Sequence, residues 1–136
     1  MTQPRIVKDI MSACPVTFSP DQDVLRAIEQ MVNDRIPGAP VVDEHGSVLG
    51  VLSQKDCLHV AVEAAYQGRW EGKVAEFMNR NVGTLDANAT LTDLPALFVN
   101  SAHELYPVVY NNRLVGQVGT REILRTLLTF EPKGPT

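Results

Sequence analysis

Ser53 and Asp56 are the side chains whose types and spacing most clearly suggest chemistry. They follow the apolar run Gly50-Val51-Leu52 and precede further apolar residues, so they mark a junction from a strand to a helix. A Ser-x-x-Asp pattern at such a junction is typical of a capping box, in which the serine oxygen accepts from a backbone amide and the acid lies at the positive end of the helix dipole. The same hydroxyl and carboxylate can also hydrogen-bond the vicinal hydroxyls of a ribose. The two interpretations are compatible, and the spacing alone does not choose between them.

No group of residues has the spacing of catalytic or metal-binding machinery. Cys14 and Cys57 lie far apart, with no CxxC motif and no paired histidines, so we expect reduced thiols and neither a zinc site nor a disulfide. His45 and His59, in a turn and on a helix, have no partner that the sequence identifies. No nucleophile stands in a pattern that places a base beside it. We therefore expect no metal and no enzymatic activity.

The elements that would position Ser53 and Asp56 occur twice, because the chain is an internal repeat. An offset of 67 positions aligns Asp9-Ile10-Met11-Ser12 with Glu76-Phe77-Met78-Asn79, and Pro40-Val41-Val42 with Pro107-Val108-Val109. Beyond that point the offset is 66, which pairs Asp56 with Glu122. The lost residue falls in a turn, where a true structural repeat tolerates it best.

Each copy is predicted to contain a short strand, a helix, a two-stranded hairpin and a second helix. In the first copy these are a strand at Val16–Phe18, a helix opening at Ser19-Pro20-Asp21-Gln22 and running through Val32, a hairpin around Gly46, and a helix from Ser53 towards Tyr66. In the second copy Asn111-Asn112 is a two-residue hairpin turn. Pro95 is expected to delay or kink the first helix of that copy.

Length and composition indicate that the two copies fold as one unit. The chain has 136 residues, of which 44% are hydrophobic and 21% charged, which is globular composition. One copy of about 55 residues has a marginal core of its own, so the copies are expected to pack together with pseudo-twofold symmetry. We expect copies at residues 6–66 and 74–130, a connection at 67–73 and a flexible tail at 131–136.

Charge and hydropathy argue against two classes of partner. Twelve Lys and Arg against sixteen Asp and Glu give a net charge of −4, and no basic block could bind a phosphate backbone. No segment has the length of a membrane span or a signal peptide. We expect a cytoplasmic protein that binds neither nucleic acid nor membrane.

Taken together, the ordered motifs resemble a tandem pair of CBS domains, named from cystathionine β-synthase. The resemblance rests on Ile10-Met11, Thr17, Pro20-Asp21, Pro40-Val41-Val42-Asp43 and Ser53-x-x-Asp56 with their counterparts in the second copy, and it covers about residues 6 to 129. It implies an α/β (α+β) fold of two β-α-β-β-α repeats. It also implies clefts between the repeats that bind an adenosine compound such as AMP, ADP, ATP or S-adenosylmethionine as a regulatory ligand, with no other cofactor, and assembly into a homodimer.

The resemblance assigns roles to particular residues. In the first cleft, Ser53 and Asp56 would hold the ribose, and Val16, Ile36, Pro37, Gly38 and Val51 would hold the adenine. The second copy departs from the pattern, with Gly119 at the serine position and Glu122 at the aspartate position. Its cleft would use Leu105, Tyr106, Thr120 and Glu122, where Leu105 and Tyr106 replace Pro37 and Gly38, and His103 could face it. Tyr106 fits the core better than a ligand platform. Phosphates would need cations, for which Arg35, Lys55 and Arg121 are the candidates.

Two functions remain open at this stage. One is a nucleotide sensor, which must bind its ligand unequally in two conformations and pass the change to an effector protein that the sequence does not identify. The other is a ligand-free dimerisation or protein-interaction module of the same fold. Binding of adenosine compounds, and its dependence on Asp56, separates them.

Overall fold

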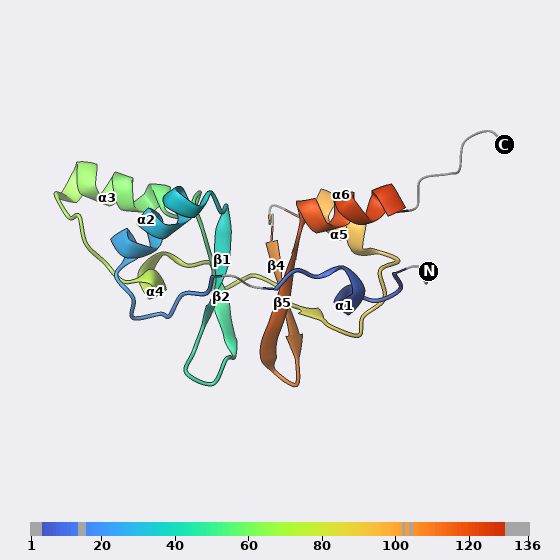
Figure 1. Ribbon diagram of the computed structural model, residues 1–136. Helices are drawn as coiled ribbons and strands as arrows, with labels where there is room; N and C mark the ends of the chain where they lie inside the picture. Colours follow the sequence, from blue (N-terminus) through green and yellow to red (C-terminus); the bar gives the residue numbers. More distant parts are fainter. Residues whose placement is uncertain (1–3, 14–15, 102, 104, 130–136) are drawn as a thin grey trace.

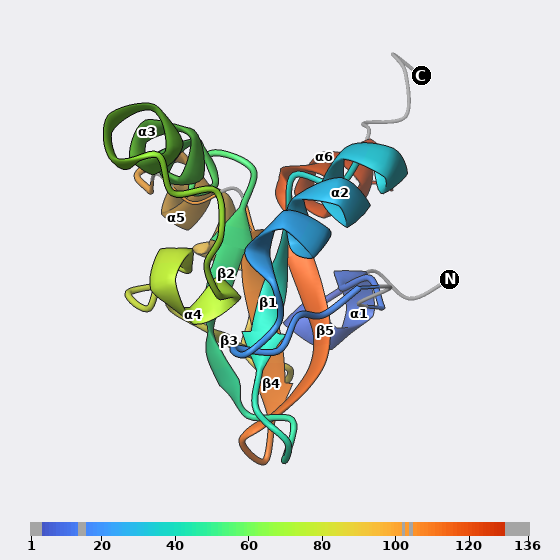
Figure 2. The same cartoon turned by 90° about the vertical axis from the view of Figure 1, so that its left-hand side faces the viewer.

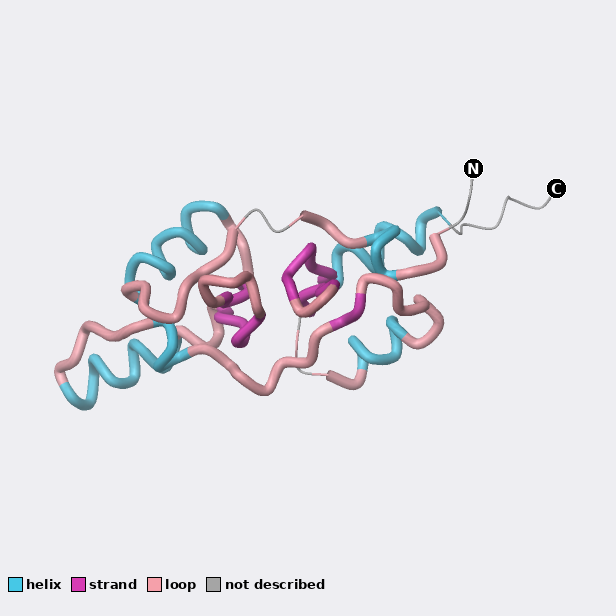
Figure 3. Tube along the Cα trace, turned by 90° about the horizontal axis from the view of Figure 1, so that it is seen from below, coloured by secondary structure: helices cyan, strands magenta, loops and turns pink. Residues whose placement is uncertain are grey.

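The computed structural model describes residues 4–13, 16–101, 103 and 105–129, and it consists of two similar units that lie side by side (Figure 1). The first unit contains the hairpin of β1 (Gly38–Val42) and β2 (Val48–Ser53), with helices α2 (Val24–Asp34), α3 (Leu58–Gln67) and α4 (Val74–Phe77). The second contains β3 (Leu85–Asp86), β4 (Leu105–Tyr110) and β5 (Arg113–Gly119), with α1 (Val7–Ile10), α5 (Leu94–Val99) and α6 (Thr120–Thr129). Seen from below, the two hairpins lie next to each other at the centre, with the helices outside them (Figure 3).

The two hairpins have the same register, which fixes the correspondence between the repeats. β1 and β2 are antiparallel with Gly38 opposite Ser53, and β4 and β5 are antiparallel with Leu105 opposite Gly119. Leu105 therefore takes the place of Gly38, and Tyr106 takes the place of Ala39. The sequence alignment, which matched these two residues to Pro37 and Gly38, is wrong by one position, and the counterpart of Pro37 lies outside the described residues.

The first short helix of each repeat packs against the unit formed mainly by the other repeat. α4 follows the connection between the repeats, yet it packs on the first unit, where the amides of Val74 and Ala75 donate to the carbonyls of Gln22 and Pro20, both at 2.9 Å. α1, the first helix of the chain, packs on the second unit, where Val7 N donates to Ala89 O at 2.9 Å. Figure 1 shows α1 beside β5 and α4 on the side of β1 and β2, and Figure 2 shows α4 beside β2. The sequence repeats and the packed units therefore do not coincide. A boundary at residues 67–73 divides the two sequence repeats, but each hydrophobic core contains residues from both sides of it.

The exchanged segments continue as extended backbone that crosses the second strand of each hairpin. Asn79 pairs with Val51 through two backbone hydrogen bonds of 2.9 and 3.0 Å, and Ser12 pairs with Gln117 through two of 2.9 Å. Gly50 and Gly116 lie at these crossings. A Cβ at Gly50 would lie 2.5 Å from Asn79 O, and one at Gly116 would lie 2.6 Å from Met11 Sδ, so only glycine allows the close approach.

The exchange also explains why the first long helix begins later than the sequence predicts. Residues Ser19–Gln22 form a turn, and α2 starts at Val24 with Asp23 as its N-cap, whose Oδ1 accepts from Leu25 N at 3.0 Å. The carbonyls of the turn accept the first amides of α4 instead of starting a helix of their own. The predicted strand at Val16–Phe18 is reduced to one parallel bridge between Phe18 and Val41, whereas its counterpart in the second unit is β3.

Other local expectations are confirmed or adjusted by small amounts. Asn111 and Asn112 both have positive φ angles, 51° and 62°, as a two-residue hairpin turn requires. Pro95 delays its helix as predicted, because α5 has six residues against eleven in α2. The helix expected from Ser53 begins at Leu58, after a turn over residues 54–57.

The two cores are separate and apolar. The first gathers Phe18, Val24, Ala27, Met31, Ala39, Val41, Leu52, Cys57, Val60, Val74 and Met78, and the second gathers Val7, Ala87, Leu94, Val108 and Val118. Each core contains residues of its own hairpin and of the short helix that comes from the other repeat, α4 in the first core and α1 in the second. Separate cores joined by exchanged segments hold the two repeats in one arrangement, and this arrangement positions the site between them.

Candidate functional site

The turn between β2 and α3 is closed by a reciprocal pair of hydrogen bonds. The amide of Ser53 donates to Asp56 Oδ2 at 3.0 Å, and the amide of Asp56 donates to Ser53 Oγ at 3.0 Å. The two reciprocal bonds of a capping box are present as the sequence predicts, but they close a turn ahead of α3, whose own N-cap, Cys57, has no side-chain cap. Within the part of the chain that the structure describes, Asp56 Oδ1 has no hydrogen-bond partner. The turn therefore fixes the positions of the serine hydroxyl and the carboxylate, and both groups can still form further hydrogen bonds.

Gln54 fixes the position of this turn against the beginning of β1. Its backbone amide donates to Pro37 O at 2.8 Å, and its side-chain Nε2 donates to Ile36 O at 2.8 Å. Gly38 then faces Ser53 so closely that a Cβ there would lie 3.1 Å from Ser53 Cα. The absence of a side chain at Gly38 leaves room beside the serine.

A cleft of about 500 Å³ opens at this point, and both repeats line it. The first repeat contributes Pro37, Gly38, Val51, Ser53, Gln54, Lys55, Asp56 and His59, and the second contributes Asn79, Val82, His103 and Leu105. The volume lies within the range of roughly 300 to 1,000 Å³ that small-molecule sites have. The wall combines an apolar part with a cluster of polar groups at the start of α3. Such a cleft suits a small molecule with one flat apolar end and several hydroxyl or charged groups.

The structure brings together most, but not all, of the residues expected in the first cleft. Pro37, Gly38, Val51, Ser53 and Asp56 line it together. Val16 and Ile36 do not line it, because their side chains pack against the first core.

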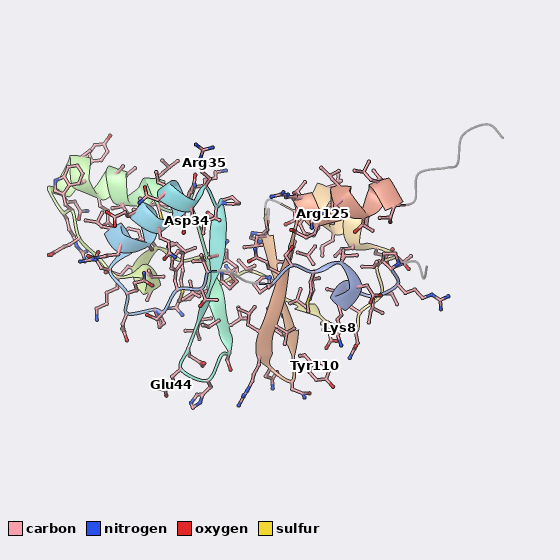
Figure 4. All side chains as sticks on the ribbon, in the orientation of Figure 1. Lys8, Asp34, Arg35, Glu44, Tyr110 and Arg125 are labelled. Carbon is pink, nitrogen blue, oxygen red and sulfur yellow. The ribbon has the colours of Figure 1, made fainter. Side chains whose placement is uncertain are left out.

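Of the three candidate cations, only Lys55 lines this cleft. Arg35 follows α2 with a positive φ of 55° and projects at the top of the view in Figure 4. Arg121 is exposed on α6 and is absent from the cleft wall. Lys55 is therefore the one sequence-based candidate for binding a phosphate that the cleft retains.

Sequence reasoning missed four residues of the cleft wall, for which a partial signal existed. His59 stands three residues after Asp56, so the two share one side of a helical turn, and this spacing could have identified it. Asn79 was already aligned with Ser12, but only the exchange of segments brings it to Val51. Gln54 and Val82 carried no signal of their own. His103, which the sequence suggested could face the second cleft, lines the first.

At the corresponding turn of the second unit, both carboxylate oxygens of Glu122 accept hydrogen bonds from other groups of the protein. Its Oε1 accepts from Gly119 N at 2.6 Å, and its Oε2 accepts from Ser12 Oγ at 2.7 Å. The residue is 8% exposed. The extra methylene of glutamate lets the carboxylate reach the exchanged segment that carries Ser12. Glu122 thus connects α6, β5 and the segment that carries Ser12, and each of its carboxylate oxygens already accepts a hydrogen bond from the protein.

Two of the other residues expected in a second cleft line different cavities. Leu105 lines the first cleft, and Thr120 lines an apolar groove of about 670 Å³ beside α5 and α6. Tyr106 is buried, packs edge-on against Phe98 at 4.9 Å between ring centres, and donates its hydroxyl to Ser101 Oγ at 2.8 Å. Tyr106 therefore belongs to the core. Leu105 is the partner of Gly119 across β4 and β5, so it lies near Thr120 and Glu122 in the fold although it lines the first cleft.

Cys57 and the acidic residues give no sign of reactivity or metal binding. Burial, together with the negative charge of Asp56, raises the pKa of the Cys57 thiol to about 11, so the thiol stays protonated at neutral pH. Cys14 lies outside the described residues. Among the residues that are described, no three His, Cys, Asp or Glu side chains converge in a way that could hold a metal ion. Within the same residues, no helix is long and apolar enough to span a membrane.

Comparison with known proteins identifies the family of this fold and site. The family model of the CBS domain matches the chain twice, at residues 7–63 and 74–129, so the chain belongs to the CBS-domain family and contains a tandem pair. The CBS domain-containing protein YhcV of Bacillus subtilis is 30% identical over 129 residues, which are 94% of this chain and 89% of YhcV. The uncharacterized protein MJ1225 of Methanocaldococcus jannaschii is 22% identical over 121 residues, but the chain spans only 42% of its length.

Solved structures of CBS pairs share the whole fold. The CBS domain pair of protein MJ0100, in complex with 5′-methylthioadenosine and S-adenosyl-L-methionine, matches with a TM-score of 0.77 and 27% identity, covering 94% of this chain and all of that one. CBSX2 in complex with AMP matches with a TM-score of 0.83 and 22% identity, covering 95% of this chain. The chain therefore has the mixed α/β architecture of a CBS-domain pair.

Proposed function

We propose that this protein is a regulatory module that binds one adenosine-containing molecule in the cleft between its repeats and acts on a separate effector protein. In this proposal the protein is cytoplasmic and performs no catalysis. The observation that carries the proposal is the cleft itself, where Ser53 and Asp56 stand at a fixed separation opposite residues of the other repeat. A ligand that contacts both repeats can bind two arrangements of them unequally, which is the requirement for regulation.

The chemistry of the cleft matches that of a nucleoside. Asp56 Oδ1 and the Ser53 hydroxyl face an open volume, and both can hydrogen-bond vicinal ribose hydroxyls. Val51 and Leu105 offer apolar surface against which an adenine ring could rest. The complexes of MJ0100 with 5′-methylthioadenosine and S-adenosyl-L-methionine support this class of ligand, since that pair shares 27% of its residues with this chain.

Thermal unfolding in the presence of candidate ligands tests the proposal. A panel of adenosine, AMP, ADP, ATP and S-adenosylmethionine at about 100 times the Kd should raise the stability by about 2.7 kcal/mol for the true ligand. Asp56→Asn should abolish most of the increase while keeping the shape of the turn. Asp34→Asn, at the exposed end of α2, is the matched control and should leave the increase intact. No shift with any compound would reject the proposal and favour the ligand-free module.

We further propose that two copies associate through the outer faces of α2, α3, α5 and α6. Exposed apolar residues occur there at matched positions of the two repeats: Val32 and Val99, Leu58 and Leu124, and Val62 and Leu128. These helices lie along one side of the molecule (Figure 1). A patch that repeats with the pseudo-twofold symmetry of the chain suits a second copy of the same chain, because a symmetric interface joins identical patches.

The oligomeric state in solution tests the association. Light scattering after size-exclusion chromatography should give twice the mass of the chain for the native protein. The double variant Val62→Glu, Leu128→Glu should give the monomer mass. Tyr110→Glu is the control, because Tyr110 is also exposed but lies at the tip of the β4–β5 hairpin, away from these helices (Figure 4). A native monomer, or a dimer that survives the double variant, would reject this interface.

A further inference from the structure

The apolar patch on the outer helices leaves the relative orientation of two associated copies open. Because the patch repeats with the pseudo-twofold symmetry of the chain, each unit can face the same unit of a second copy, in a head-to-head pair, or the other unit, in a head-to-tail pair. Both orientations bury the same apolar side chains. Differences in shape and charge between the two units therefore decide between them.

The second unit has a groove at the place where the first unit has a longer helix. The groove has a volume of about 670 Å³ and lies beside α5 and α6, with Val99 and Leu124 of the patch in its wall. Leu91 and Thr92 also line it, and by the offset of 67 they correspond to Val24 and Leu25, the first two residues of α2. Since α5 has six residues against eleven in α2, the second unit lacks helical turns here and is hollow.

The first unit presents a ridge on its side of the patch. Leu58, Val62 and Tyr66 are spaced four residues apart along α3, so they follow one line on the surface of the helix. All three are exposed, Tyr66 by 85%. A ridge of side chains packs best into a groove. Head-to-tail pairing places the ridge of each copy against the groove of the other, whereas head-to-head pairing places groove against groove and ridge against ridge.

The charges beside the patch on α6 are positive. Arg121 and Arg125 are exposed, and each precedes an exposed leucine of the patch, Leu124 or Leu128, by three residues, which puts them on the same face of the helix. The acid of this helix, Glu122, is buried. Head-to-head pairing would therefore bring the arginines of both copies together.

The patch on α2 has an acidic neighbour instead. Glu29 is exposed and precedes Val32 by three residues, on the same face of the helix. Arg26 and Asp34 are six and two residues from Val32, so they lie on other sides of α2. Within the described residues Glu29 forms no ion pair. Head-to-tail pairing brings this carboxylate to the basic face of α6 in the other copy, which is the complementary arrangement.

We propose that two copies pair head-to-tail, with the α3 ridge of each against the groove beside α5 and α6 of the other, and with Glu29 facing Arg121 and Arg125. This inference rests on the proposed association, because it specifies the orientation of the same interface. The contact occurs twice in the pair, so each favourable or unfavourable charge counts twice. Both grooves and both ridges are covered, and assembly stops at two copies.

Reversal of charge on α6 and α2 tests the orientation, with the Kd of the dimer measured by sedimentation equilibrium. The variant Arg121→Glu, Arg125→Glu and the variant Glu29→Arg should each weaken the dimer by about tenfold, because each places like charges opposite one another. All three changes in one chain should restore the native Kd. Lys8→Glu with Arg113→Glu is the matched control, because these exposed cations lie on α1 and at the start of β5, away from the patch (Figure 4 labels Lys8).

Disulfide trapping reports the orientation directly. In a chain with Cys14→Ser, the changes Val62→Cys and Leu128→Cys each add one exposed thiol to the patch, while Cys57 is buried. Under mild oxidation either variant alone should give little cross-linked dimer. A mixture of the two, after exchange of subunits, should give a cross-linked dimer that contains one chain of each.

The outcomes separate the orientation from the association. If the native chain is a monomer, the proposed association fails and the orientation fails with it. If the native chain is a dimer but the three combined charge changes do not restore its Kd, the inference is wrong and the interface stands. Efficient cross-linking of Val62→Cys alone would show a head-to-head pair and would also overturn the inference.

Discussion

The junction between β2 and α3 and the junction between β5 and α6 occupy the same place in the two repeats, yet their side chains are used in opposite ways. In the first, Asp56 lines the cleft and accepts one amide through Oδ2, and among the described residues its Oδ1 has no hydrogen-bond partner. In the second, Glu122 accepts one amide and one hydroxyl, and both oxygens are used. One additional methylene and the absence of a serine hydroxyl at Gly119 accompany this change from a turn that lines a cleft to one whose carboxylate is bonded within the protein. The comparison shows that the two repeats keep the same fold while using these side chains differently.

The partner of each carboxylate explains the difference. Ser12 lies where Asn79 lies in the first unit, since both follow an exchanged helix and both pair with the second strand of a hairpin. The Ser12 hydroxyl donates to Glu122, whereas the Asn79 side chain accepts from Asn81 N at 2.9 Å, and within the described residues it forms no hydrogen bond with Asp56. The exchanged segments thus contact the two turns differently.

The largest expected effect is on ligand affinity and concerns only one of the two carboxylates. Asp56→Asn should weaken binding of the adenosine compound by about 10- to 100-fold, because a hydrogen bond to a charged group contributes about 1.5–3 kcal/mol. Glu122→Gln should change the affinity by less than about twofold. Titration calorimetry of both variants measures this, and equal losses in the two would show that the turns are not distinct.

The next effect is on the free energy of unfolding, where a substitution of Glu122 should cost more than a substitution of Asp56. Glu122→Ala leaves the Gly119 amide and the Ser12 hydroxyl without a partner in a buried place and should lower the free energy of unfolding by about 1–3 kcal/mol. Asp56→Ala removes a cap from a partly exposed turn and should lower it by about 1 kcal/mol. Urea unfolding without ligand gives both values. A larger loss in Asp56→Ala would contradict the structural role given to Glu122.

The crossings of the exchanged segments give a third comparison. Gly50→Ala and Gly116→Ala should both destabilise the fold by about 1–3 kcal/mol, as overpacking does. The loss should be greater at Gly50, where the new methyl group meets a backbone oxygen at 2.5 Å, than at Gly116, where the closest atom is the movable Met11 sulfur at 2.6 Å. Gly68→Ala is not a clean control, because Gly68 has a positive φ of 66°. Gly83→Ala serves instead, because a Cβ at Gly83 would meet its nearest atom, Tyr106 Cε1, at the ordinary contact distance of 3.7 Å. Urea unfolding that left both glycine variants as stable as the native chain would contradict the tight crossings.

The smallest expected effect is on stability at low pH, and it should be the same for the two exchanged helices, α1 and α4. Backbone hydrogen bonds from Arg5 and Ile6 hold the pKa of Asp9 below its ordinary value, and a backbone hydrogen bond from Lys73, then the side chain of Arg69, does the same for Glu76. A lowered pKa in the folded state stabilises the protein above the unfolded pKa, near 4, and the contribution is lost as the pH falls through the folded pKa.

Asp9→Asn and Glu76→Gln should therefore lower Tm at pH 6 and have little effect below about pH 3. Thermal scans of the native chain and of the two variants at these pH values measure the difference. If the difference in Tm were the same at both pH values, the carboxylates would not be acting through their charge.

Much of the fold could be predicted from the sequence because the same order of apolar runs and turns occurs in both repeats. The matched apolar runs gave both hairpins, the Asn111-Asn112 turn and the delay at Pro95, since these depend on residues close together in the chain. The exchange of α1 and α4 could not be predicted, because it depends on which carbonyls remain free at Pro20 and Gln22 after tertiary packing. The late start of α2 follows from the same long-range pairing, whereas the position of Leu105 opposite Gly119 agrees with the offset of 67 already visible in the repeat.

The site shows a similar division. The presence of Ser53, Asp56 and Gly38 in one cleft wall could be predicted, because they belong to a local turn and to the strand beside it. The positions of Val16 and Ile36 against the first core could not, because an apolar side chain beside a strand can face either the core or a cleft. The cleft that His103 lines could not be predicted either, because it depends on how the two repeats pack.

The stoichiometry of binding tests the central claim most directly. Titration calorimetry of the native chain with AMP should give one site per chain, and Asp56→Asn should weaken binding at that site by about 10- to 100-fold. Glu122→Gln should leave it unchanged. Two sites per chain, or one site that survives Asp56→Asn and disappears in Glu122→Gln, would contradict the assignment of an open first turn and a closed second one.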